Sequence, residues 1–195
     1  IALAGTEIAG LRPSLIAALG MARTFQNIRL FGELSVLDNV KLACHVRAKQ
    51  TMAGAILRTA FARREEAAQT QQAMELLEVF DLANRADEPA RSLPYGDQRR
   101  LEIARALATK PKVLLLDEPA AGMNPQEKKE LRELIRRVRE QFNVTVLLIE
   151  HDMGLVMEIC EVITVLDHGQ VISVGPPEHV QKDPKVVEAY LGIAE

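Results

Sequence analysis

The chain has 195 residues, and 24 Lys and Arg against 27 Asp and Glu give it a formal net charge of −3. Hydrophobic residues make up 48% and charged residues 26%, which excludes disorder as the dominant state and leaves no basic footprint for nucleic acid. The longest apolar run, residues 15–22, is interrupted by Gly20 and is shorter than the ~20 residues of a membrane span. Cys44 and Cys160 form no disulfide framework, so a reducing, cytoplasmic compartment is predicted.

Residues 1–35 are interpreted as the end of an amino-terminal core part. A short helix is expected over Pro13–Leu19, and a loop that contains Gln26 follows it. The chain begins with Ile1 rather than Met, and residues 3–8 resemble the end of a structural element that begins before Ile1. We therefore expect an amino-terminally truncated chain.

Residues 36–90 are predicted to form a helical subdomain. Leu76, Leu77 and Phe80 recur at helical spacing, while residues 63–66 are charged and supply a solvated face. Pro89 and Pro94 bracket a break before the pattern changes. This stretch is expected to be an insertion into an α/β domain.

Strands alternate with helices over residues 91–175, and residues 176–195 are predicted to be a helical tail. Two apolar runs are typical of strands buried on both faces, Val113–Leu116 and Val144–Ile149. Between them an amphipathic helix begins after Asn124, which can cap it, with Pro125 at the first position. A helix near residues 153–160 and a hairpin of residues 162–167 with 170–174 follow. The alternation predicts a mainly parallel α/β sheet, whose active residues gather at the carboxyl ends of strands.

Asp117 and Glu118 come directly after the first of these strands. A carboxylate in that place can hold Mg²⁺, usually through water, and a second can deprotonate an attacking water. The alternative is that Asp117 only caps the next segment. The adjacent Glu118 and Pro119 favour the chemical interpretation, a Walker B motif.

Residues 93–98, Leu93-Pro94-Tyr95-Gly96-Asp97-Gln98, are a glycine-containing turn that leads into a helix. The amino end of a helix is an anion site, and Arg99, Arg100 and Arg105 add positive charge there. Taken alone, such a sequence is usually only a turn. Here Gly96 lies 21 residues before Asp117, which adds weight to a role in binding.

His151 follows the second strand, Val144–Ile149, and Glu150. At the carboxyl end of that strand its imidazole can contact a phosphate or a water beside Asp117 and Glu118. A lone His is more often structural or solvated. No Cys/His cluster in the sequence has metal-ligand spacing.

Together, these residues resemble the nucleotide-binding subunit of ABC transporters, a P-loop NTPase-type fold with an inserted helical subdomain. In that resemblance Gln26 is the Q-loop glutamine, and Leu93–Gln98 is the signature motif. Val113–Glu118 is then Walker B, and His151 the switch histidine. The D-loop corresponds to Ala121, Gly122, Met123 and Asn124.

Further stretches are similar to the ATPase of branched-chain amino-acid importers, and to one of its two subunit types in particular. They are residues 23–31, 95–102, 120–125, 149–153 and 189–192.

The chain departs from the wider family pattern in three places. Pro94 replaces the usual signature Ser and has neither a hydroxyl nor a backbone N–H for a phosphate, while Tyr95 replaces a Gly. Asn124 replaces the D-loop acid. None of the 11 glycines is followed by Lys, so the sequence contains no Walker A motif. We expect that loop, with the first strands, to lie upstream of Ile1, and the 195 residues alone to be inactive; a naturally degenerate ATPase is the alternative.

The resemblance implies an ATPase that energises the import of branched-chain amino acids. Two ATP would lie between two ATPase subunits, and each signature motif would face the partner subunit's ATP. Asp117 would organise Mg²⁺, Glu118 would act on the attacking water, and Gln26 and His151 would sense the γ-phosphate. The implied partners are membrane permease subunits, a second ATPase and, indirectly, an external substrate-binding protein, with no nucleic acid. The implied place is cytoplasmic, peripheral on the inner face of the plasma membrane.

Residues 26–49 carry the predicted permease contact. Leu30, Phe31 and Leu34 place apolar side chains in a loop beside a predicted helix over residues 36–49, where a partner would cover them. The alternative is that they fold back onto the chain's own core.

Two other functions remain open from the sequence. One is the ATPase of a lipid or lipopolysaccharide exporter, which the Tyr95-Gly96-Asp97 variant argues against. The other is a non-transport ABC ATPase, which predicts basic stripes or a tandem second ATPase domain.

Overall fold

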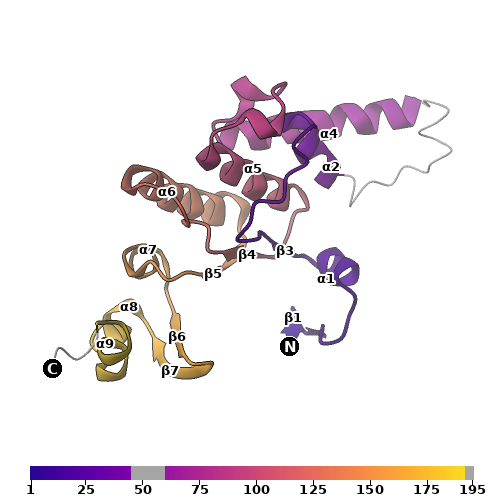
Figure 1. The fold of residues 1–195 in the computed structure, drawn as a ribbon. Helices are drawn as coiled ribbons and strands as arrows, with labels where there is room; N and C mark the ends of the chain where they lie inside the picture. The colour runs from indigo at the N-terminus through magenta and orange to yellow at the C-terminus, as the bar shows by residue number, and fades with distance from the viewer. Residues whose placement is uncertain (45–59, 192–195) are drawn as a thin grey trace.

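The computed structural model describes residues 1–44 and 60–191 (Figure 1). A three-stranded parallel sheet lies at its centre in the order β3-β4-β5. These strands are β3 (Met21–Arg23), β4 (Val113–Asp117) and β5 (Thr145–Ile149). Leu115 pairs with Arg23 on one side and with Leu147 on the other. The carboxyl ends of the three strands therefore meet at one edge, as predicted for an α/β fold.

Helices α2, α4 and α5 gather above the sheet in Figure 1. They are α2 (Val36–Cys44), α4 (Ala60–Val79) and α5 (Tyr95–Ala108), with 3₁₀ helices Ala83–Arg85 and Ala90–Ser92 between α4 and α5. Helix α5 packs against both α2 and α4. Fully buried Val40, Leu77 and Leu101 come from the three helices and share one core with Leu114 of β4. The helical character predicted here is confirmed for the described residues; residues 45–49 of the predicted 36–49 helix lie outside them.

Helix α6 (Pro125–Phe142) begins where the sequence predicts it. The Asn124 side chain accepts hydrogen bonds from the amides of Gln126 (2.9 Å) and Glu127 (3.0 Å), and Glu127 accepts one from the Asn124 amide (2.8 Å). This capping box satisfies amide groups that have no partner inside the helix. The helix buries Leu131, Leu134, Ile135 and Val138.

The carboxyl-terminal part has a second, smaller core. Its elements are α7 (Met153–Ile159), β6 (Ile163–Asp167), β7 (Gln170–Gly175), α8 (Pro177–Val180) and α9 (Pro184–Leu191). Strands β6 and β7 form the predicted antiparallel hairpin. Val165 of β6 packs with Val156, Val180 and Val186 of the helices. Residues 192–195 of the predicted tail lie outside the described residues.

The amino-terminal segment contains one predicted helix and three strands that were not predicted, β3 and two short strands before the helix. Helix α1 (Pro13–Leu19) has the expected bounds and ends at Gly20. The φ of 108° at Gly20 is a left-handed conformation that glycine adopts without strain. Strands β1 (Ala2–Leu3) and β2 (Thr6–Glu7) form a small antiparallel pair.

The burial predicted for the two central strands is wrong for one face. In β4, Leu114 and Leu116 are buried, but Val113, Leu115 and Asp117, which alternate with them, are only half-buried. In β5, Leu147 and Ile149 are 53% and 50% exposed. An apolar run fixes the strand, but whether both faces are covered depends on elements distant in sequence.

No helix within residues 1–44 and 60–191 is long and apolar enough to cross a membrane.

Candidate functional site

Gln26, Glu118 and His151 converge at the carboxyl edge of the sheet. The Gln26 Nε2 donates a hydrogen bond of 2.8 Å to Oε2 of Glu118. The other carboxylate oxygen of Glu118, Oε1, lies 3.9 Å from Nδ1 of His151. The three residues follow β3, β4 and β5 respectively, so the parallel topology brings them together. The sequence predicts that Glu118 and His151 lie at one edge of the sheet, and the structure adds Gln26 to them.

Glu118 has an unusual backbone. Its φ of +44° lies in the left-handed region, which costs energy for a residue with a Cβ. Its amide donates to the carbonyl of Ile149 at 2.9 Å, which ties the end of β4 to the end of β5. The Glu118 side chain remains 29% exposed and that of His151 71%, so both are accessible to a ligand.

Asp117 is paired with an arginine that sequence reasoning missed. Nη2 of Arg23 donates to Oδ2 of Asp117 at 2.6 Å, and the Asp117 amide donates to the Thr24 hydroxyl at 3.4 Å. A carboxylate at this edge has the oxygen chemistry that Mg²⁺ prefers. Among the described residues, no group of three or more His, Cys, Asp and Glu is arranged to hold a metal ion.

The predicted signature motif forms the entry to α5. Pro94 precedes the helix without a side-chain cap, and Tyr95 begins it. The Gln98 side chain donates to the Leu93 carbonyl at 2.8 Å, and Asp97 accepts from Arg85 at 2.7 Å. These two polar side chains therefore hold the turn and its neighbour in place.

The predicted D-loop contacts Tyr95 at one end and Glu150 at the other. Gly122 has a φ of +75°, and its position faces the ring of Tyr95, because a Cβ there would lie 3.7 Å from that ring. At the other end the amide of Ala120 donates to Glu150 at 2.8 Å, one residue before His151. Asn124 caps α6, as the sequence predicts.

The signature motif and the D-loop also share a small hollow of about 90 Å³. Pro94 and Gly96 line it from one side, and Met123 and Glu127 from the other. The predicted site residues Leu93, Tyr95, Gln98, Ala121 and Gly122 are not part of its lining.

The prediction that three arginines supply an anion site at the start of α5 is wrong for Arg99. Its side chain is fully buried and forms an ion pair of 2.8 Å with Glu102. Arg105 donates to the Arg29 carbonyl, and Arg100 pairs with Glu130 at 2.6 Å. Helical spacing cannot reveal the backbone carbonyls that Arg99 and Arg105 bind, because these lie 74 and 76 positions away in sequence.

Asp152 anchors the start of α7 next to His151. Its carboxylate accepts from Lys128 Nζ at 2.6 Å and from the Leu155 amide at 3.1 Å. The Lys128 hydrogen bond is the main reason that the pKa of Asp152 is below its ordinary value. The position of His151 is thereby coupled to α6.

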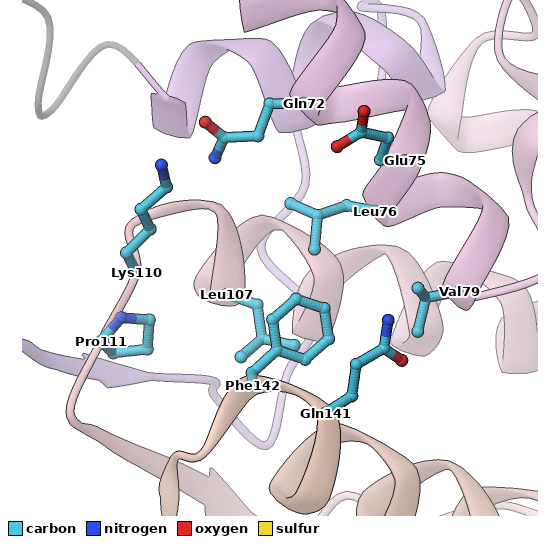
Figure 2. Close-up of a pocket in the computed structure, with 9 residues that line it drawn as sticks. All are labelled: Gln72, Glu75, Leu76, Val79, Leu107, Lys110, Pro111, Gln141 and Phe142. Carbon is cyan, nitrogen blue, oxygen red and sulfur yellow. The ribbon is translucent and has the colours of Figure 1, made fainter.

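A larger cavity of about 510 Å³ lies away from these residues (Figure 2). It opens between α4 and the carboxyl ends of α5 and α6, with Leu76, Leu107 and Phe142 on an apolar floor and Glu75 and Lys110 among its polar residues (Figure 2). None of the predicted site residues lines it. The larger cavity is therefore separate from the predicted site.

Residues 2–121 match the family model of ABC transporters. The chain belongs to this family. Residues 170–195 also match the model of branched-chain amino-acid ATP-binding cassette transporters. Two relatives are 45% identical over 194 residues, which is 100% of this chain and 76% of each relative: the high-affinity branched-chain amino-acid transport ATP-binding proteins LivG of Escherichia coli (strain K12) and BraF of Pseudomonas aeruginosa. The chain is an ATPase subunit of this group.

A solved structure agrees with the fold. The ADP conformation of MJ1267, an ATP-binding cassette of an ABC transporter, has a TM-score of 0.77 at 29% identity. The similarity covers 96% of this chain and 75% of that one. The predicted α/β, P-loop NTPase-type fold is confirmed.

Proposed function

We propose that this chain energises the import of branched-chain amino acids, and that it does so at the sheet edge that carries Gln26, Asp117, Glu118 and His151. The observation that carries the proposal is the convergence of Gln26 and His151 on the two oxygens of Glu118, at 2.8 and 3.9 Å. The substrate class is taken from the names of the relatives LivG and BraF.

Glu118 is the proposed base for hydrolysis. A water attacks the γ-phosphorus and gives its proton to Glu118, while the bond from that phosphorus to the bridging oxygen breaks and ADP leaves. The Gln26 amide holds one carboxylate oxygen, which leaves the oxygen on the His151 side to accept the proton. His151 is the proposed hydrogen-bond donor to the γ-phosphate, where negative charge is stabilised.

Asp117 is the proposed ligand of Mg²⁺. Its carboxylate ends β4 at the same edge, and it already accepts a cationic donor, Arg23, at 2.6 Å. Mg²⁺, when bound with ATP, neutralises charge on the phosphates. Asp117 fits that ion because Mg²⁺ is held through one or two carboxylates and the phosphates rather than by a full protein cage.

The turn and the D-loop are proposed to act between two ATPase subunits. Leu93, Pro94, Tyr95, Gly96, Asp97 and Gln98 would face the partner's ATP, with Ala121, Gly122, Met123 and Asn124 beside them. Pro94, Gly96 and Asp97 of the turn share the lining of the 90 Å³ hollow with Met123 of the D-loop, which supports this assignment. The division into residues 1–35, 36–90, 91–175 and 176–195 is part of the same proposal.

Permease subunits are the proposed membrane partners, on the inner face of the plasma membrane, with a substrate-binding protein on the other side. Phe31 and Leu34 are 50% and 39% exposed in the loop before α2, which supports a contact there, whereas Leu30 packs against the chain's own core. Asn39, fully buried, holds this loop by hydrogen bonds to both backbone groups of Phe31 at 3.0 Å. An ordered loop with exposed apolar side chains is suited to docking.

Hydrolysis is tested in a subunit that carries a phosphate-binding loop as well as residues 1–195. His151→Ala should lower kcat by about 100-fold and change the KM for ATP by less than about threefold, because the donor acts in the transition state. His168→Ala is the matched control, since His168 is 93% exposed in the β6–β7 turn. Normal turnover in His151→Ala, or loss of ATP binding alone, contradicts the assignment.

Docking is tested with Phe31→Asp. The variant should keep its melting temperature and ATP binding, while co-purification with the permease falls by about tenfold or more. Tyr190→Asp on α9 is the matched control, because Tyr190 is an aromatic residue of similar exposure, 47%. Unchanged co-purification, or unfolding of Phe31→Asp, places the permease contact elsewhere.

A further inference from the structure

Arg99 of α5 is a fully buried arginine that binds the backbone of the Gln26 loop. Its Nη1 donates to the Phe25 carbonyl at 2.6 Å, and its Nη2 donates to the Gln26 carbonyl at 2.7 Å. The same nitrogens contact Oε2 of Glu102 at 2.8 Å and the Tyr95 hydroxyl at 3.2 Å. One guanidinium thus joins the loop to the first turn of α5.

Glu102 binds the same loop through the opposite type of backbone group. Its Oε1 accepts hydrogen bonds from the amides of Phe25 at 3.4 Å and Arg29 at 3.3 Å. Its side chain is 2% exposed. Together, Arg99 and Glu102 contact both the donors and the acceptors of the backbone that surrounds Gln26.

A buried ion pair is a weak source of stability, because desolvation of both charges offsets their attraction, and apolar residues of similar size often serve as well. This pair also leaves Nε of Arg99 buried without a hydrogen-bond partner among the described residues. What apolar residues cannot replace is the set of hydrogen bonds to the loop backbone. The arrangement therefore favours a role in placing that loop.

We propose that Arg99 and Glu102 are positioning residues, which fix the backbone of residues 25–29 so that the Gln26 side chain reaches Glu118. The inference rests on the proposed roles of Gln26 and Glu118. The Gln26 side chain donates to the Glu118 carboxylate, and the Gln26 carbonyl accepts from Arg99. Holding this peptide in place therefore directs the side chain toward Glu118.

The same contacts couple the loop to the signature motif. Tyr95 shares Nη2 of Arg99 with the Gln26 carbonyl, and the ring of Tyr95 lies beside Gly122 of the D-loop. A movement of the first turn of α5 is thus transmitted to Gln26 through one side chain. Tyr95, a departure from the family's usual Gly, supplies the hydroxyl for this link.

The test is the double variant Arg99→Met/Glu102→Leu, which removes the charges together and leaves an apolar pair of similar volume. It should fold, exchange its Phe25 and Arg29 amide hydrogens about tenfold faster or more, and lose about tenfold in kcat with the KM for ATP within about twofold. Exchange is measured on residues 1–195, and kcat in the subunit that also carries the phosphate-binding loop. The matched control is Arg132→Met/Glu158→Leu, an ion pair between α6 and α7 that does not contact the loop.

Native exchange at Phe25 and Arg29 together with native kcat in the double variant overturns the proposal. If the double variant fails to fold, Arg99→Lys tests the proposal instead. Its ammonium keeps the charge beside Glu102 but cannot donate to both backbone carbonyls in the geometry of a guanidinium. Arg99→Lys should then show the faster exchange, and native exchange in it also overturns the proposal. Normal hydrolysis by Glu118→Gln instead contradicts the proposed site, and it leaves the exchange result standing.

Discussion

Asn39 shows at the scale of one residue how the loop before α2 is ordered. Besides its two bonds to Phe31, its Nδ2 donates to the carbonyls of Leu34 at 3.4 Å and Ser35 at 2.9 Å. Asn39→Leu keeps the size, takes away the acceptor of the Phe31 amide and removes the side-chain donor to these carbonyls, which each keep a backbone donor. It should therefore lower the free energy of unfolding by about 1–3 kcal/mol. Urea unfolding measures this. Exposed Asn27→Leu is the control, and equal stability of both variants contradicts the role given to Asn39.

Site residues could be predicted where they follow a predicted strand, and they were missed where their partner lies far away in sequence. Glu118 and His151 each follow a predicted strand, so parallel topology predicts that they meet. Gln26 was assigned by the resemblance to the Q-loop, since the strand before it, β3, was not predicted. Arg23 and Asp117 are 94 positions apart, and only the pairing of β3 with β4 makes them neighbours. Arg99 was expected at an anion site because helical position does not tell whether a side chain points to solvent or to a loop 73 positions away.

At the scale of elements, the start of α7 depends on one ionised carboxylate. The pKa of Asp152 is lowered by Lys128, so the folded state favours its charged form. A lowered pKa gives stability that is present above the ordinary value of 3.8 and lost as the pH falls below it. Asp152→Asn, which keeps a cap and removes the charge, should therefore lower stability by about 0.5–1 kcal/mol at pH 7.

The measurement is the urea midpoint of Asp152→Asn and of the unaltered chain at pH 7 and at pH 3. The difference between the two proteins should shrink at pH 3, because below the ordinary pKa of 3.8 the carboxyl takes up a proton more readily in the unfolded state than in the folded state. Asp81→Asn is the control. A difference that is the same at both values of pH contradicts the ionised cap.

Elements were predictable where local chemistry defines them. Asn124, Pro125 and Glu127 mark the start of α6, and His168-Gly169 marks the turn of the hairpin. The two-residue strands β1 and β2 were missed because they are too short for a periodic pattern. The prediction that both faces of β5 are buried was wrong, because the exposure of a strand depends on the whole fold.

At the scale of the whole molecule, apolar side chains remain exposed on sheet faces. Leu166 and Val171 pair across the β6–β7 hairpin and are 56% and 57% exposed. Exposed apolar patches drive association. The variant Leu166→Lys/Val171→Lys should lower the self-association of residues 1–195 by about tenfold in dissociation constant and leave the melting temperature within about 3 °C.

Sedimentation velocity over a range of concentrations measures this association. Glu178→Lys/Glu188→Lys on α8 and α9 is the control, which adds positive charge without removing apolar surface. If the control lowers association as much as the hairpin variant does, charge and not the apolar face accounts for the effect.

The central claim is that Glu118, held by Gln26 and close to His151, is the base of an ATPase site. The most direct test is phosphate release and ATP retention by Glu118→Gln, in the subunit that carries a phosphate-binding loop as well as residues 1–195. Phosphate release should fall by about 100-fold or more, while ATP stays bound between two subunits. Phosphate release at the unaltered rate from Glu118→Gln would contradict it.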